Sequence, residues 1–437
     1  MIPTAENSMK RILLVMMQPP GSSGVQGLIY NKILPYLEEN GWEFHFAGPA
    51  PQLTSVLTEP VHCSPDRLHY TDHVSWSLRF SVLKNRQHKR SLAFYGYAAL
   101  QLVSRAIEKL IRHNSHEYLI TGLRKSISAA DGTWNFDLIA GKSPDFMILK
   151  AVAKLTRDLN KPLVAMVVDP YGKRDGESFI PYEQPIQAKI LEQCCGAMFM
   201  SPLTCDRYIK TGLVKPSKVY PFTDSYPSSE HLYRKGISCL PQVKALHSEN
   251  SGQHPIHMVH LGMLPEWRPI ETLLEAMESA SISPFLDIFG YVYPAARQTI
   301  QSKLRLRNHI RCNKAVGYED SHLVAEDCSA LLVVIGPRHL DNQPSKFFEY
   351  LGHRKPLLVL GPPGNPIEEI VRDLGIGVYC DILNRDAISH GIDKVSSHYN
   401  QFVNAYHLNS HKIEIYSAQE VARHWANCLN KMLAASR

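Results

Sequence analysis

Residues 329–365 constrain the fold most, because apolar strand patterns alternate there with a helix pattern. The run 331–335 is continuously apolar and branched, which is typical of a strand buried on both faces, and 357–360 is a second such run. Between them, Pro344 and Ser345 open a helix, since proline fits a first helical turn and serine can cap it. The segment predicts a strand-helix-strand unit of a parallel sheet, which binds ligands where the strand ends and the helix begins.

Two carboxylates flank the start of this helix. Asp341 lies in the preceding loop, and Glu349 lies one turn into the helix. A carboxylate at this position can accept both hydroxyls of a ribose, while the free N–H groups and the dipole of the helix start favour a phosphate. The alternative is that Glu349 is an ordinary solvated helix residue.

The segment D-N-Q-P-S-K-F-F-E-Y-L-G-H-R-K-P-L-L-V-L resembles the nucleotide-sugar site of retaining glycosyltransferases of the GT-B fold, the glycogen-synthase-like family (glycosyl transferases group 1). That family carries two glutamates with seven residues between them, and the second binds the donor ribose. Glu349 matches the second glutamate. Asp341 replaces the first and keeps the charge with a shorter reach. The resemblance implies that Pro344, Ser345 and Lys346 lie at the donor diphosphate and that Asp341 faces the sugar.

The alternation of strands and helices runs through two halves of the chain. It predicts an α/β fold with two doubly wound, Rossmann-like domains, which in the resembled family face each other across a cleft. We expect an N-terminal acceptor-side domain at 1–223 and a donor domain at 256–415. The linker at 224–255 is rich in Ser, Pro, His and charge. A last helix at 416–437 is expected to return toward the first domain.

Three positions in the first half are candidates for the acceptor side. The loop P-P-G-S-S-G-V-Q-G follows the first strand but is not G-x-G-x-x-G, so a dinucleotide fingerprint is not supported. The resemblance assigns Gly21 and Gly24 to the acceptor or the donor phosphates; a plain tight turn is the alternative. Lys142 or Ser143 occupies the place of the family's usual sugar-contacting histidine. Asp169 ends a buried strand, either at the cleft or as a cap of its own loop.

The donor loop of the second half begins at Gly262. The family carries an arginine directly after this glycine and a lysine about five residues later, and both neutralise the diphosphate. Here Met263 replaces the first cation, and Arg268 sits at the place of the second. Tyr318 lies in the loop that flanks the nucleotide base in the family. His260, inside an apolar strand, is interpreted as a packed core histidine.

Several chemistries are not indicated. The nine cysteines of the 437-residue chain form no C-x-x-C, and H-E-x-x-H is absent, so reduced cytosolic thiols are expected rather than disulfides or a zinc site. No Asp-x-Asp ends a strand, so no metal is expected. The first residues do not resemble a signal peptide, and no stretch approaches the ~20 apolar residues of a membrane span. These features predict a cytoplasmic protein.

The positive charge is concentrated between 79 and 125. This stretch holds ten Lys and Arg against Glu108 and Glu117, a local charge of +8, whereas the whole chain carries +6. Within it, 92–111 has a helical apolar stripe and follows a basic cluster made of Lys84, Arg86, Lys89 and Arg90. The pattern predicts contact with an anionic membrane surface; a solvated helix that covers the sheet is the alternative. No nucleic-acid motif accompanies the charge.

The resemblance and the residues together predict a metal-independent hexosyltransferase. It would move a sugar from a nucleoside-diphosphate sugar, with UDP-sugar expected, to a glycan, lipid-linked or small-molecule acceptor, with retention and without a cofactor. Arg268 and Lys346 would stabilise the leaving diphosphate. Two alternatives stay open: a nucleotide-sugar epimerase of the same fold, and a non-catalytic nucleotide-sugar-binding partner of a transferase.

Overall fold

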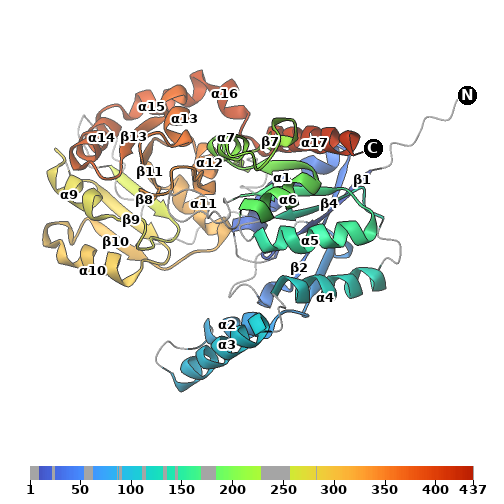
Figure 1. The fold of residues 1–437 in the computed structure, drawn as a ribbon. Coiled ribbons are helices and arrows are strands. Elements are labelled where there is room, and N and C mark those ends of the chain that lie inside the picture. Colours follow the sequence, from blue (N-terminus) through green and yellow to red (C-terminus); the bar gives the residue numbers. More distant parts are fainter. Residues whose placement is uncertain are drawn as a thin grey trace, which may run out of the picture. The chain divides into compact units, whose positions relative to one another are not determined.

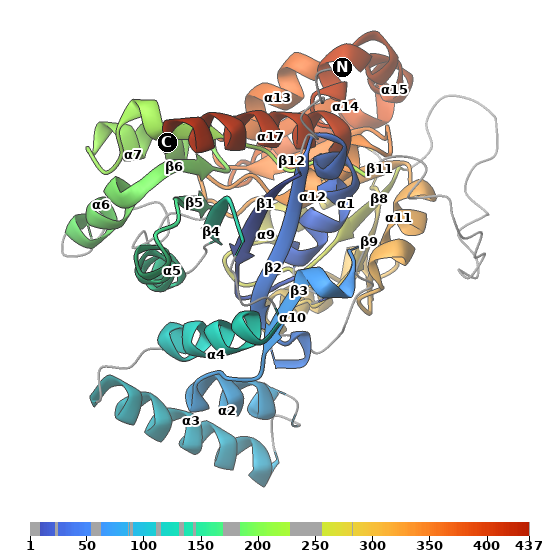
Figure 2. The same cartoon turned by 90° about the vertical axis from the view of Figure 1, so that its right-hand side faces the viewer.

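The computed structural model describes residues 9–21, 25–53, 63–85, 87, 91–110, 115–130, 135–142, 146–168, 184–227, 256–281 and 283–436 (Figures 1 and 2). The described residues form two compact units. The first combines residues up to 223 with 421–436, and the second comprises 224–420. The end of the chain therefore belongs to the unit that contains its beginning.

The first unit is built on a seven-stranded sheet in the order β3-β2-β1-β4-β5-β6-β7. All neighbouring strands pair in parallel. The strands are β1 (Lys10–Val15), β2 (Trp42–Pro49), β3 (Leu68–Thr71), β4 (Leu138–Lys142), β5 (Leu163–Val167), β6 (Cys194–Phe199) and β7 (Val219–Pro221). The strand order reverses between β1 and β4, so the loops that follow these two strands diverge at one edge of the sheet.

Helices cover this sheet because each presents an apolar stripe to it. They are α1 (Val25–Glu39), α4 (Ser115–Ala130), α5 (Phe146–Leu159), α6 (Gln184–Gln193), α7 (Pro202–Lys210) and α17 (Ala418–Ala435). Trp425 attaches α17 to this unit. It is fully buried, and its ring lies 5.8 Å from that of Tyr30 and 5.0 Å from that of Phe222.

A helical hairpin of α2 (Trp76–Asn85) and α3 (Leu92–Leu110) stands apart from the sheet. In both Figure 1 and Figure 2 the two helices lie side by side, beyond α4. The predicted helix 92–111 is therefore present, but the alternative in which it covers the sheet is wrong. No described helix is long and apolar enough to cross a membrane.

The second unit contains a six-stranded parallel sheet in the order β10-β9-β8-β11-β12-β13. Its strands are β8 (His257–Leu261), β9 (Phe285–Phe289), β10 (Ile310–Asn313), β11 (Ala330–Val334), β12 (Leu357–Gly361) and β13 (Gly377–Asp381). Its helices are α9 (Glu271–Ser279), α10 (Pro294–Ser302), α11 (Tyr318–Glu326), α12 (Ser345–Leu351), α13 (Pro366–Leu374), α14 (Arg385–Ser397), α15 (Tyr399–Leu408) and α16 (Ser410–Glu414). Short 3-10 helices occupy Pro51–Leu53, Pro65–Arg67, Pro216–Lys218 and Leu304–Leu306.

The predicted strand-helix-strand unit is β11-α12-β12. All residues of both strands are buried, and Leu331 pairs with Leu357 in parallel register. The predicted serine cap is wrong. Pro344 itself occupies the N-cap with extended backbone angles, so Ser345 is already the first helical residue and its hydroxyl makes no cap. Phe347 and Phe348 are fully buried and anchor the helix on the sheet.

Candidate functional site

The two loops that carry the predicted donor residues start on neighbouring strands. The order of the second sheet reverses between β8 and β11, and ligands of such sheets bind at the carboxyl ends of the strands at this point. The backbone N–H of Leu261 donates to Tyr350 Oη of α12 at 3.0 Å. A Cβ added at Gly336 would overlap the carbonyl oxygen of Trp267. The ends of β8 and β11 and helix α12 therefore meet in one place.

Lys346, Glu349 and Tyr318 form a cluster at this place. Lys346 Nζ lies 2.9 Å from Glu349 Oε2 and 5.9 Å from the ring centroid of Tyr318. Glu349 is only 4% exposed, so the alternative of a solvated helix residue is wrong. A carboxylate buried to this degree needs a partner for its charge, and Lys346 supplies one.

Tyr318 packs against His322, which in turn contacts His353. The Tyr318 ring stands edge-on to His322 at 4.6 Å, and His322 Nδ1 lies 2.9 Å from His353 Nε2. His353 Nδ1 in turn lies 2.6 Å from Glu326 Oε1. Burial alone would raise the pKa of the Glu326 carboxyl, but the hydrogen bond and charge of His353, helped by Lys355, lower it. This series of contacts holds Tyr318 in position. No spacing of residues in the sequence indicated these contacts.

Arg268 makes a contact across the loop that begins at Gly262. Gly262 has a φ of +137°, and a Cβ added at Gly290 would overlap its carbonyl oxygen, so the chain turns tightly here. The Arg268 guanidinium is partly buried and donates to the Met263 carbonyl at 3.4 Å. Burial lowers the pKa of Arg268. A guanidinium withdrawn from water interacts more strongly with an anion than a fully hydrated one.

His260 is a buried side chain on which the charges of both cations act. As predicted, it is a buried histidine, and its Nδ1 lies 3.0 Å from the Leu332 carbonyl oxygen on the neighbouring strand. Burial lowers the pKa of His260 to about 4, and the charges of Arg268 and Lys346 act in the same direction. Both cations therefore lie close enough to one buried ring to affect its protonation.

The side chain of Asn365 stabilises the loop that carries Asp341 through hydrogen bonds to its backbone. Asp341 is 7% exposed. The amide of Asn365 donates to the carbonyl oxygens of Leu340 and Asn342, both at 2.9 Å, while its Oδ1 accepts from Ile367 N and caps α13. Sequence reasoning treated this asparagine only as part of a Gly/Pro loop.

Asn365→Asp is expected to destabilise the protein by ~2–4 kcal/mol. The aspartate still caps α13, but two partly buried carbonyls lose their donor and face a carboxylate instead. Denaturant unfolding measures the loss, with Asn384→Asp as the matched control, because Asn384 only caps α14 and aspartate is an equally good cap. Equal stability of the Asn365→Asp variant and the wild type would show that these bonds do not hold the loop.

Gln343 is a further buried residue of this loop that sequence reasoning did not select. It is 6% exposed, and its Oε1 has no hydrogen-bond partner among the described residues. Leaving a buried acceptor unsatisfied costs about 1–3 kcal/mol. A ligand hydroxyl at this place would remove that cost.

The predicted acceptor residues belong to the first unit. Gly21 follows β1 with a φ of +90°, as a tight turn requires. Lys142 ends β4 and is 2% exposed, with its Nζ 4.5 Å from the ring centroid of Tyr30. Gly24, Ser143 and Asp169 lie outside the described residues. The acceptor role of this set stays a prediction.

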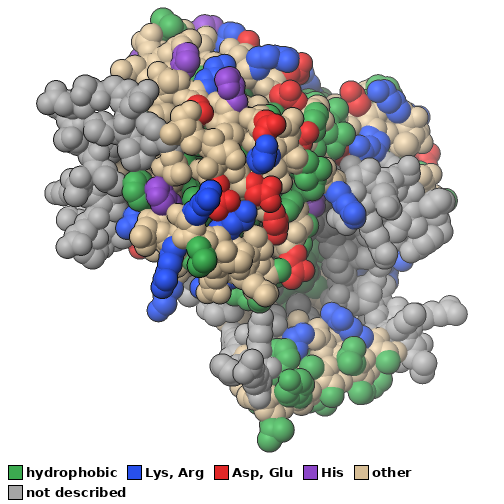
Figure 3. All heavy atoms as spheres, turned by 90° about the vertical axis from the view of Figure 1, so that its left-hand side faces the viewer, with side chains coloured by type: hydrophobic (Ala, Val, Ile, Leu, Met, Phe, Trp, Pro, Cys, Tyr) green, Lys and Arg blue, Asp and Glu red, His purple; other side chains and the backbone are tan. Residues whose placement is uncertain are grey.

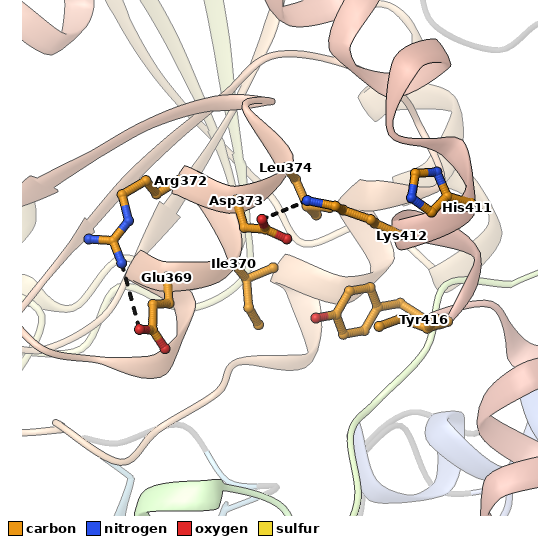
Figure 4. Close-up of a pocket in the computed structure, with 9 residues that line it drawn as sticks. Glu369, Ile370, Arg372, Asp373, Leu374, His411, Lys412 and Tyr416 are labelled. Carbon is orange, nitrogen blue, oxygen red and sulfur yellow. Dashed lines mark hydrogen bonds and ion pairs between the residues drawn. The ribbon is translucent and has the colours of Figure 1, made fainter.

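A hollow of about 870 Å³ lies elsewhere on the second unit, between α13 and α16 (Figure 4). Its two carboxylates are already paired: Lys412 Nζ lies 2.7 Å from Asp373 Oδ1, and Arg372 lies 3.6 Å from Glu369. We assign no function to it. Within the described ranges, no group of three or more His, Cys, Asp or Glu side chains is arranged to hold a metal ion.

Comparisons with known proteins establish the fold. No family model matches the chain, and no curated protein sequence matches it. Sucrose-phosphate synthase from Thermosynechococcus elongatus superposes with a TM-score of 0.65 at 12% identity, covering 98% of this chain and 100% of that one. HepE from Anabaena in complex with UDP and glucose gives a TM-score of 0.59 at 12% identity, with 96% and 99% covered. The lipopolysaccharide outer core galactosyltransferase WaaB gives 0.54 at 12% identity, with 96% and 99% covered.

These neighbours are GT-B glycosyltransferases, and they match this chain over nearly its whole length. The predicted fold class, α/β with two doubly wound parallel-sheet units, is therefore confirmed.

Proposed function

We propose that this protein is a glycosyltransferase that moves a hexose from a UDP-sugar to an acceptor with retention. The observation that carries the proposal is the cluster of Glu349, Lys346 and Tyr318 at the reversal point of the second sheet. The fold around this cluster is shared with sugar transferases, among them HepE in complex with UDP-glucose.

Each member of the cluster has a part in holding the donor. The Glu349 carboxylate accepts the ribose hydroxyls. Lys346, whose Nζ is 2.9 Å from that carboxylate, reaches the phosphates beside the ribose. The Tyr318 ring provides a flat surface for the base. The buried acceptor on Gln343 supports this placement, since a donor hydroxyl would satisfy it.

Catalysis is stabilisation of the leaving group. Cleavage of the bond between sugar and diphosphate develops negative charge on the diphosphate, and positioned cations stabilise that charge in the transition state. Arg268 and Lys346 take this role. The N–H groups of Ser345 and its neighbours add to it, but α12 has only seven residues, so we place most of the effect on the two cations. Asp341 faces the sugar, and we assign no nucleophile or base.

The acceptor is a glycan, a lipid-linked sugar or a small molecule, bound by the first unit near Gly21 and Lys142. The concentration of positive charge at 79–125 supports peripheral attachment of the protein to an anionic membrane.

The proposal is tested by incubating the full chain with a panel of nucleotide sugars. Donors are first selected by thermal shift, because a ligand of the native state raises the melting temperature. Release of free UDP, with the sugar passed to water or an acceptor, identifies a transferase. Interconversion of the sugar without UDP release would identify the epimerase instead. Binding without either reaction would leave the non-catalytic partner.

The reaction is expected to need no divalent metal, because Arg268 and Lys346 take the place of a metal at the diphosphate. The initial rate of UDP release should therefore stay within ~2-fold in excess chelator. The same measurement with added manganese is the control. A rate that collapses in chelator and returns with manganese would contradict the assignment of the cations.

A further inference from the structure

The inward side of helix α3 carries both polar and apolar residues, and its outward side is apolar. Gln101 and Ser104 are buried, whereas Leu102 and Ile107 are 67% and 55% exposed. Gln101 Oε1 accepts a hydrogen bond from Lys84 Nζ of α2 at 2.8 Å. The helix therefore makes a polar contact within the hairpin, and a large part of its hydrophobic surface stays exposed to solvent.

The exposed apolar residues form one continuous stripe, which we call the α3 face. Its members recur at helical spacing and are all exposed: Leu92, Tyr95, Ala99, Leu102, Val103, Ala106 and Ile107. With Trp76 and Leu100, the hairpin holds seven of the sixteen large hydrophobic side chains that are exposed among the described residues. A soluble protein rarely leaves such a contiguous patch uncovered, and one of this kind marks an interaction site.

The charge around the α3 face selects the partner. Residues 76–110 contain seven Lys and Arg against one acid, Glu108. Arg79, Lys84 and Arg105 are the cations with described side chains. In Figure 3 the described side chains that are visible on the lobe formed by the hairpin are hydrophobic or cationic rather than acidic. An apolar helix face bordered by cations of one sign fits the boundary between anionic headgroups and acyl chains.

We propose that the α2–α3 hairpin is a membrane anchor, in which the α3 face lies flat in the headgroup region of an anionic bilayer. The 19 residues of α3 make it ~28 Å long, enough for several side chains to enter the lipid together. This deepens the proposed peripheral attachment, and it names the acceptor as lipid-linked. Only the identity of the acceptor rests on the proposed transferase function; the anchoring does not.

Co-sedimentation of the full chain with vesicles tests the anchor. The vesicles contain phosphatidylcholine alone or mixed with phosphatidylglycerol, from low salt to ~1 M, where the Debye length is ~3 Å. The wild type is expected to bind the anionic vesicles, and this binding should weaken as the salt concentration rises. The triple variant Leu102→Ser, Val103→Ser, Ile107→Ser should lose roughly tenfold or more of this binding. Arg105→Glu should weaken binding mainly at low salt.

A matched control removes exposed hydrophobic residues from elsewhere. Leu304→Ser with Leu408→Ser, at sites 76% and 71% exposed in the second unit, should bind vesicles like the wild type. Far-UV circular dichroism and thermal unfolding check that all variants fold. Donor hydrolysis should be unchanged in the triple variant, because none of the three substituted residues is among those that we assign to donor binding.

Three results would overturn the anchor. The wild type could bind neither kind of vesicle, or the triple variant could bind the anionic vesicles as tightly as the wild type does. Alternatively, the protein could self-associate through this face without binding lipid, as sedimentation velocity of the wild type and the triple variant would show. A wild type that binds vesicles but hydrolyses no donor would leave the anchor intact and contradict the transferase proposal instead.

Discussion

Arg268→Ala is expected to lower the rate of sugar transfer by about 10²–10³-fold, the cost of removing one preorganised donor to a developing negative charge. Binding of UMP should fall much less, because UMP lacks the β-phosphate on which the leaving charge grows. Arg268 is partly buried. Burial lowers the pKa of His260, and the charges of Arg268 and Lys346 both act in the same direction. Steady-state kinetics with a UDP-sugar and calorimetry with UMP measure the two effects.

Two further variants make this experiment specific. Arg268→Lys keeps a cation but loses the fork geometry, so it should recover only part of the rate. Arg307→Ala removes an exposed arginine outside the site in the same unit and should have no effect. An equal fall of rate and UMP binding would make Arg268 a plain nucleotide contact. No change in either would mean that the assignment of this loop is wrong.

Glu349→Ala is expected to weaken UDP binding by ~1.5–3 kcal/mol, the range for hydrogen bonds to a charged group. From the sequence alone, a Glu349 that binds the donor would open toward the cleft, and the fold would tolerate its loss. In the structure the carboxylate is buried against Lys346, so removing it also leaves a cation without its partner and lowers stability. Glu349→Gln keeps the shape and separates the two effects. Calorimetry gives the affinity, and thermal unfolding gives the stability.

A double-mutant cycle with Lys346→Ala completes this test. Because the two side chains are in contact, their effects on UDP affinity should not add. Glu369→Ala is the control, since that carboxylate lies at the hollow beside α13 (Figure 4) and should leave the affinity unchanged. UDP affinity that is the same in Glu349→Gln, Glu349→Ala and the wild type would remove Glu349 from the donor site.

Local patterns in the sequence determined the sheets and the donor helix. The apolar runs behind β11 and β12 indicated buried parallel strands, because strands covered on both faces need apolar residues at every position. The predicted strand 357–360 lies within β12. The three-residue spacing of Lys346 and Glu349 places both on one face of a helix. The resemblance of this short motif could therefore indicate both residues together.

Only the tertiary structure decided which residues surround that helix. Asn365, His322 and His353 reach the site from separate elements, and their contacts depend on how distant segments pack, which no local spacing encodes. The segments 68–85, 115–130 and 385–414 also fold into elements that were not predicted.

The same distinction holds for α3. Its periodicity determined that one side of the helix is apolar, but not that this side faces outward. That was decided by the packing of α2 against the side of α3 that carries Gln101, which accepts a hydrogen bond from Lys84, so the opposite, apolar side is left exposed.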